Sequence, residues 1–211
     1  MTTDPRSRRS SMVWAPVAIG TASAIASSII LIWLNGALRH RHLANAYAGD
    51  MGQGFPASGL EGGGAAARRT LASWSQYAGL HEGTTGRSIA YLWLAVDAAF
   101  LATLGYGLIA AAVYRAARHP SGLAWLAARR GGIGHRLVLV GSALGLVLVA
   151  VDLIENLLAT VVIATDGGGP AGFLRVWGRA KWVLAACALV FSLVGLVALV
   201  FTKSARSKAN V

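Results

Sequence analysis

Four long apolar runs dominate this chain and limit what it can fold into. They cover residues 13–38, 88–114, 137–165 and 181–202. Each run reaches or exceeds the ~20 apolar residues that a helix needs to cross the hydrocarbon core of a bilayer. The sequence therefore predicts an all-α integral membrane protein, built as a bundle of four transmembrane helices.

The composition agrees with this prediction and leaves little chain for a soluble domain. Of the 211 residues, 55% are hydrophobic and 13% are charged, whereas soluble domains carry about 25% charged residues. The longest connection, residues 39–87, is rich in Gly and Ala and has few large apolar residues to bury. We expect a basic cytoplasmic tail over 1–12, a transmembrane domain over 13–202 that includes this extracytoplasmic loop, and a second cytoplasmic tail over 203–211.

The basic residues predict an orientation rather than a nucleic-acid partner. The net charge is +11, but the Lys and Arg residues gather at the ends of the apolar runs instead of on a single face. Such residues orient a membrane protein and contact anionic lipid. With both termini cytoplasmic, eleven of the 19 basic residues lie inside. We expect this topology, no nucleic-acid binding, and location in a bacterial inner membrane.

The first apolar run also resembles an export signal. Arg8 and Arg9 precede it, and Ala44-Asn45-Ala46 follows as a small-residue cleavage site. A signal core has about 7 to 15 apolar residues, whereas this run has 26, over residues 13–38. We therefore expect an uncleaved first helix.

Small residues recur at helical spacing in three of the runs. Such stripes let helices approach closely in a membrane, either within one bundle or between two copies of a chain. The candidate packing residues are Gly20, Ala24 and Ser28 in the first run, Gly141 and Gly145 in the third, and Ala188, Ser192 and Gly195 in the fourth.

The first loop contains a segment with helical periodicity. Leu71, Trp74 and Ala78 fall on one face of a helix over residues 68–80. This pattern is typical of a short helix lying at the membrane interface, although a solvated loop is the alternative.

The sequence gives little evidence for a metal site or for cysteine chemistry. The loop residues His40, His42, His81 and Glu82 could gather on a metal ion, but histidines beside arginines are more typical of a basic interfacial flank. The single cysteine, Cys187, excludes a disulfide within the chain and a Cys-based metal cluster. We expect no metal and no cofactor, and no sequence motif predicts an enzyme.

The best functional signal is a group of carboxylates inside the apolar runs. Asp97 lies in the second run, and Asp152 and Glu155 lie in the third. An ionised carboxylate near the bilayer centre costs roughly 2.5 to 3.5 kcal/mol or more, so such residues usually face a bundle interior and have a function. Asn156 extends the pattern, because Asp152, Glu155 and Asn156 fall on one helical face.

The expected depth of these residues in the membrane predicts that Asp97 and Glu155 lie close together. Asp97 lies nine residues after Ser88, and Glu155 lies nine residues before Ala164. Nine residues of helix span roughly 13 Å, so the two carboxylates lie at one level if the second and third helices are antiparallel neighbours. On the third helix, Ser142 and Thr160 are possible secondary polar contacts.

No Lys, Arg or His is expected at that level. Three neighbouring carboxylates cannot then all remain ionised, because burial and like-charge repulsion both oppose it. The set could share protons, hold a cation with help from Asn156, or receive a basic residue from a partner subunit; a neutral, hydrogen-bonded lock between helices is the structural alternative. The sequence thus suggests a transport or channel role linked to protons or cations, or else an accessory subunit whose polar helix face docks a partner membrane protein.

Overall fold

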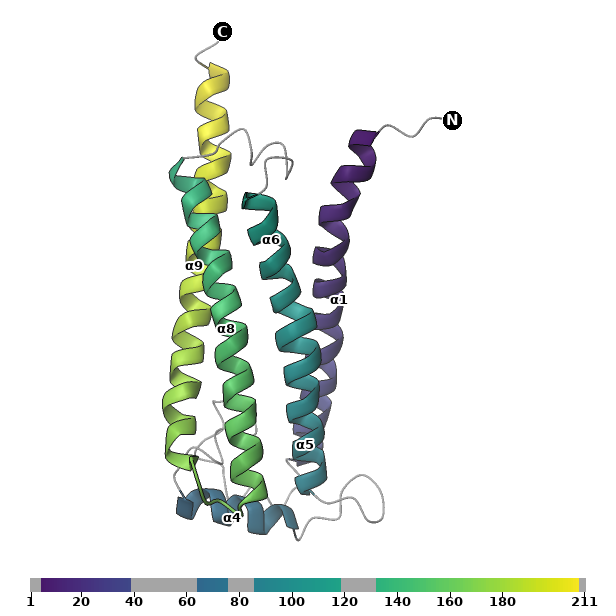
Figure 1. Ribbon diagram of the computed structural model, residues 1–211, viewed down its shortest axis with the longest axis vertical. Coiled ribbons are helices and arrows are strands. Elements are labelled where there is room, and N and C mark those ends of the chain that lie inside the picture. The colour runs from purple at the N-terminus through teal and green to yellow at the C-terminus, as the bar shows by residue number, and fades with distance from the viewer. Residues whose placement is uncertain (1–4, 39–63, 76–85, 119–131, 209–211) are drawn as a thin grey trace. The chain divides into compact units, whose positions relative to one another are not determined.

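The computed structural model describes residues 5–38, 64–75, 86–118 and 132–208, and no strand occurs within them. Figure 1 shows the helices in chain order. They are α1 (Pro5–Leu38), α4 (Gly64–Ser75), α5 (Gly86–Val96), the π-helical segment η1 (Asp97–Gly107), α6 (Leu108–Arg118), α8 (Ile133–Ala164) and α9 (Ala171–Lys208).

Four helical stretches are long and apolar enough to cross a membrane. They are Trp14–Leu34, Gly86–Arg118, Ile133–Ala164 and Ala171–Leu199. The prediction of an all-helical chain with four membrane-length helices is confirmed, whereas the orientation of the termini stays a prediction.

Large apolar side chains remain exposed on these helices, as expected for surfaces in contact with lipid. On α1 they include Ile25, Ile29 and Ile32, and on α9 they include Val183 and Leu193. In a bilayer such side chains lie in apolar surroundings, so their exposure carries no penalty from water.

The second spanning stretch is irregular in its middle. It begins as α5, continues as η1 from Asp97, and bends at Gly105, whose φ and ψ are −77° and −105°. Sharp bends in helices usually occur at proline, at glycine and serine pairs or at π-helical insertions.

A tight turn joins α8 to α9. Asp166 has a left-handed φ of 51°, and the amide of Gly167 donates to the Val162 carbonyl at 2.9 Å. The amide of Asp166 donates to the Ile163 carbonyl at 3.4 Å, which completes the bonding pattern of a Schellman helix end. Because α9 starts at Ala171, only a few residues later, α8 and α9 form a helical hairpin.

The chain divides into two compact units that share the long helices. The first unit comprises residues 1–23, 103–149 and 182–211, and the second comprises 24–102 and 150–181. Each is described on its own below.

In the first unit, α8 and α9 approach through the small residues expected to mediate packing. A Cβ atom added to Gly141 would lie 2.7 Å from the Ser192 nitrogen and 3.0 Å from the Ala188 oxygen. A Cβ on Gly195 would lie 2.8 Å from the Val138 nitrogen. These distances are too short for any side chain, so backbone contact requires glycine at both positions.

Two other glycines in this unit sit at helix contacts. A Cβ on Gly20 would lie 2.9 Å from the Gly105 oxygen, and one on Gly145 would lie 3.0 Å from the Ala110 Cβ. In the same unit, Nε2 of the buried His135 ring donates to the Ala117 carbonyl at 2.9 Å. That bond ties the C-terminal end of α6 to the start of α8 and satisfies a terminal carbonyl of α6.

The buried face of α1 departs slightly from the expected stripe. Gly20, Ser27 and Leu31 are buried, whereas Ala24 and Ser28 are half-buried. A stripe with four-residue spacing drifts around a helix of 3.6 residues per turn, so after two steps the buried position is Ser27 rather than Ser28.

In the second unit, apolar side chains from five helices form one core. Its fully buried members include Leu34, Leu71, Ile163 and Leu174, from α1, α4, α8 and α9, and α5 adds Ile89. This core lies in the unit that also holds the buried carboxylates.

The short helix α4 belongs to this core. Ala67 and Leu71 are buried in it, and a Cβ on Gly167 would lie 2.7 Å from the Arg68 nitrogen, so α4 packs on the turn between α8 and α9. A helix is therefore present over part of the expected segment, from Gly64 to Ser75, and its buried residues Ala67 and Leu71 contact protein. Ala78 lies outside the described residues.

The possible metal ligands of the first loop, His40, His42, His81 and Glu82, lie outside the described residues.

Candidate functional site: a buried acid–lysine cluster

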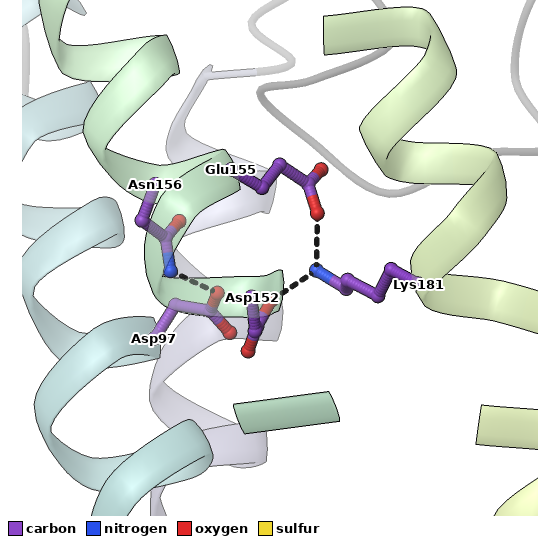
Figure 2. Close-up of polar contacts among 5 residues, drawn as sticks. All are labelled: Asp97, Asp152, Glu155, Asn156 and Lys181. Atoms are coloured by element: carbon purple, nitrogen blue, oxygen red, sulfur yellow. Dashed lines mark hydrogen bonds and ion pairs between the residues drawn. The ribbon is translucent and has the colours of Figure 1, made fainter. Parts of the chain in front are cut away.

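Five polar side chains meet inside the second unit (Figure 2). Asp97 comes from the start of η1, Asp152, Glu155 and Asn156 come from α8, and Lys181 comes from α9. Asp152 is 1% exposed, Asp97 3%, Glu155 6% and Asn156 7%, and the Lys181 side chain is 21% exposed. We call these residues the acid–lysine cluster.

Lys181 bridges two carboxylates of α8. Its Nζ lies 2.5 Å from Asp152 Oδ1 and 3.1 Å from Glu155 Oε2. One ammonium can reach both because Asp152 and Glu155 are three residues apart and therefore lie on one helix face. Figure 2 shows the ammonium between the two carboxylates.

Asp97 has a different partner. Asn156 Nδ2 donates to Asp97 Oδ2 at 2.9 Å, which links η1 to α8. Among the residues that the structure describes, Asp97 forms no ion pair. The amide bond satisfies one oxygen of Asp97 but leaves its charge without a directly contacting cation.

The expectation that no basic residue lies at this level was wrong, because Lys181 contacts Asp152 and Glu155. The fourth apolar run of the sequence starts at Lys181, but α9 begins at Ala171, which places Lys181 about 15 Å into the helix. Glu155 lies roughly 13 Å before Ala164, the last residue of α8. On the two arms of a hairpin, these positions fall at the same level.

The sequence did contain a signal for Lys181. That signal is spacing, because Ala171, Leu174, Gly178 and Lys181 are three or four residues apart and therefore share one helix face. In the structure the first three are buried and Lys181 is half-buried. Arg175 and Arg179 interrupt the apolar character of this stretch, so hydropathy alone predicts a helix that starts later than α9 does.

The secondary polar residues bond their own helix. Thr160 Oγ1 donates to the Asn156 carbonyl at 2.8 Å. Ser142 Oγ donates to the Val138 carbonyl at 2.8 Å and to the Leu139 carbonyl at 3.1 Å. Thr160 thus adjoins the cluster through the backbone of Asn156, whereas Ser142 belongs to the first unit.

The cluster is distinct from the charges at the end of α8. There, Arg87 and Asp166 form an ion pair of 2.5 Å whose side chains are 33% and 71% exposed. Pairs of this kind stabilise proteins by about 0 to 1 kcal/mol. Buried apolar residues of α8, among them Ala159 and Val162, lie between this pair and the cluster, so the cluster is not an extension of the interfacial charges.

The charges in the cluster do not balance. If every group were ionised, three carboxylates and one ammonium would leave two negative charges. Buried charges are tolerated when they are paired and hydrogen-bonded, and an unmatched one is strongly unfavourable. The arrangement therefore suits the uptake of protons or of an additional cation.

The chain matches no family model, no curated protein and no solved structure.

Proposed function

We propose that this protein handles protons or cations at the acid–lysine cluster, as part of a transport or channel role in a bacterial inner membrane. In this proposal both termini are cytoplasmic, and the protein has no hydrolytic or redox chemistry of its own. The basic residues in the tails and in the middle connection support the orientation.

One observation carries the proposal, namely the unequal number of carboxylates and ammonium groups buried within candidate spans. Asp97, Asp152 and Glu155 face a single Lys181. Ionisable residues inside membrane helices are costly and commonly mark proton relays or ion pathways. An ion pair needed only for helix packing would not require the additional carboxylate.

The accessory-subunit alternative receives less support from the geometry. A polar face that docks a partner must be accessible, but Asp152, Glu155 and Asn156 are turned onto Asp97 and Lys181 within the chain. A purely structural polar lock remains the competing explanation, and experiment separates it from ion handling.

The separating experiment exchanges titratable groups for amides of the same shape. Glu155→Gln and Asp152→Asn retain hydrogen bonding, so a polar lock should keep most of its stability, because contacts between neutral groups contribute about 0.6 to 2 kcal/mol in membranes. Ion handling should be lost. We would measure thermal stability and ion flux in vesicles for each variant, with Asp166→Asn as the matched control outside the cluster. Stable variants with unchanged flux would rule out the proposed role.

The orientation is tested by cysteine labelling. With Cys187 replaced by Ser, single cysteines at Ser58 and Ser121 should react from opposite sides of the membrane. Labelling of Ser58→Cys only from outside and of Ser121→Cys only from inside is the expected result; the reverse would place both termini outside.

A further inference from the structure

The position between Asp152 and Glu155 is already occupied by a cation belonging to the chain. The Lys181 ammonium lies 2.5 Å from Asp152 Oδ1 and 3.1 Å from Glu155 Oε2. These are the oxygens that a monovalent metal ion would need, since hard cations bind carboxylate oxygens. An ion arriving from outside would have to displace the lysine.

Asp97 lies beside this pair but is held by a neutral group. Its Oδ2 accepts from Asn156 Nδ2 at 2.9 Å, and it is 3% exposed. A neutral amide offers a hydrogen bond but no positive charge, so it compensates an ionised Asp97 less well than Lys181 compensates its own two partners.

The charged groups around Asp97 come from two helices. From α8 it faces the carboxylates of Asp152 and Glu155, and from α9 it faces the ammonium of Lys181. The apolar span of α1, Trp14–Leu34, carries no titratable residue. The charged residues of α4, Arg68 and Arg69, are exposed. Around Asp97, the described charges in the cluster are thus two carboxylates and one ammonium.

We infer that the ion handled by this site is a proton, that the Asp97 carboxyl group carries it, and that Lys181 is the resident counterion that keeps metal cations out of the position between Asp152 and Glu155. This inference rests on the proposed function and names the ion.

The proton balance is simple. The Asp97 carboxylate takes one proton to become a carboxylic acid, and the charge of the cluster changes from two negative charges to one. Because Oδ2 already accepts from Asn156, Oδ1 is the oxygen left to carry the proton. On release, the same O–H bond breaks and the ionised state returns, while Lys181 stays between its two carboxylates.

The first test asks whether metal cations bind. The thermal unfolding temperature of the purified full-length protein in lipid nanodiscs is measured in Na⁺, K⁺ and N-methylglucamine chlorides at constant ionic strength. A cation that binds only the folded state raises this temperature. We expect no difference between the salts for the unmodified protein, and a rise in Na⁺ or K⁺ for Lys181→Met, in which the position between the carboxylates is open. A rise specific to Na⁺ or K⁺ in the unmodified protein would overturn the inference.

The second test locates the proton. Infrared spectroscopy should show a protonated-carboxyl band that disappears in Asp97→Asn and persists in the control Asp166→Asn. This measurement needs no lysine variant, so it shows whether Asp97 carries the proton even if Lys181→Met does not fold. A band that survives in Asp97→Asn would place the proton elsewhere and contradict the inference.

Flux measurements separate this inference from the proposed function. In phosphatidylethanolamine–phosphatidylglycerol vesicles, we expect flux driven by a pH gradient that is lost in Asp97→Asn and retained in Asp166→Asn. Flux driven by a Na⁺ or K⁺ gradient and indifferent to pH would keep the proposed function but overturn the proton assignment. Absence of flux under every gradient, together with an Asp97-dependent carboxyl band, would rule out the transport role and support the assignment of the proton to Asp97.

Discussion

The two compact units hold helices together by different means. In the first unit, α8 and α9 touch through the glycine contacts at Gly141 and Gly195, which leave no room for side chains between the backbones. In the second unit, larger side chains fill the core, and the acid–lysine cluster bridges η1, α8 and α9. Among the described residues, buried ion pairs occur in the second unit, and they are the basis of the function that we propose for it.

The variant that should affect this contrast most strongly is Lys181→Met. It leaves Asp152 and Glu155 buried without their shared cation, and breaking a buried ion pair from one side costs about 3 to 5 kcal/mol. Denaturation of the purified protein in detergent measures the loss. The double variant Lys181→Met with Glu155→Gln should recover part of it, because one uncompensated charge is gone. A single variant as stable as the unmodified protein would show that the cluster is not maintained by this ion pair.

The apolar part of the second unit is probed by Leu71→Ala. Leu71 of α4 lies in the core, where it is 1% exposed. Removing a buried leucine side chain costs roughly 2 to 5 kcal/mol. Proteolysis and denaturation would reveal whether α4 detaches before the rest of the unit unfolds. Ala72→Ser, at an exposed position of the same helix, is the control, and we expect it to stay within about 0.5 kcal/mol of the parent.

The first unit is probed by Gly141→Val. A Cβ at this position would lie 2.7 Å from the Ser192 nitrogen, so α8 and α9 must separate, and such overpacking costs about 1 to 3 kcal/mol. Gly172→Ala is the matched control, because a Cβ there meets nothing within 4 Å. Similar stability of the two variants would mean that the glycine contact does not hold the helices together.

The smallest effect is expected from Asp166→Asn. This change removes the exposed ion pair with Arg87, which is worth about 0 to 1 kcal/mol. Asn also tolerates the left-handed backbone that Asp166 adopts with φ 51°. Thermal unfolding should therefore shift little. A loss comparable to that of Lys181→Met would show that interfacial charges matter as much as the buried ones.

The sequence by itself determined the spanning helices and much of the polar pattern. Apolar run length predicts a membrane helix directly, because the thickness of the bilayer is fixed. Helical periodicity placed Asp152, Glu155 and Asn156 on one face, and the rise per residue placed Asp97 and Glu155 at similar depth. The shared helix face needs only local geometry, whereas the shared level of Asp97 and Glu155 also assumes that the second and third helices are antiparallel neighbours.

Only the tertiary structure decided which partners the carboxylates have. It brought Lys181 to Asp152 and Glu155, gave Asn156 to Asp97, and packed α4 against the turn before α9. Lys181 escaped detection because the start of α9 is not marked by a sharp change in hydropathy, and the level of a residue depends on where its helix starts. Contacts between residues distant in the chain depend on how helices face one another, which periodicity within a single helix does not specify.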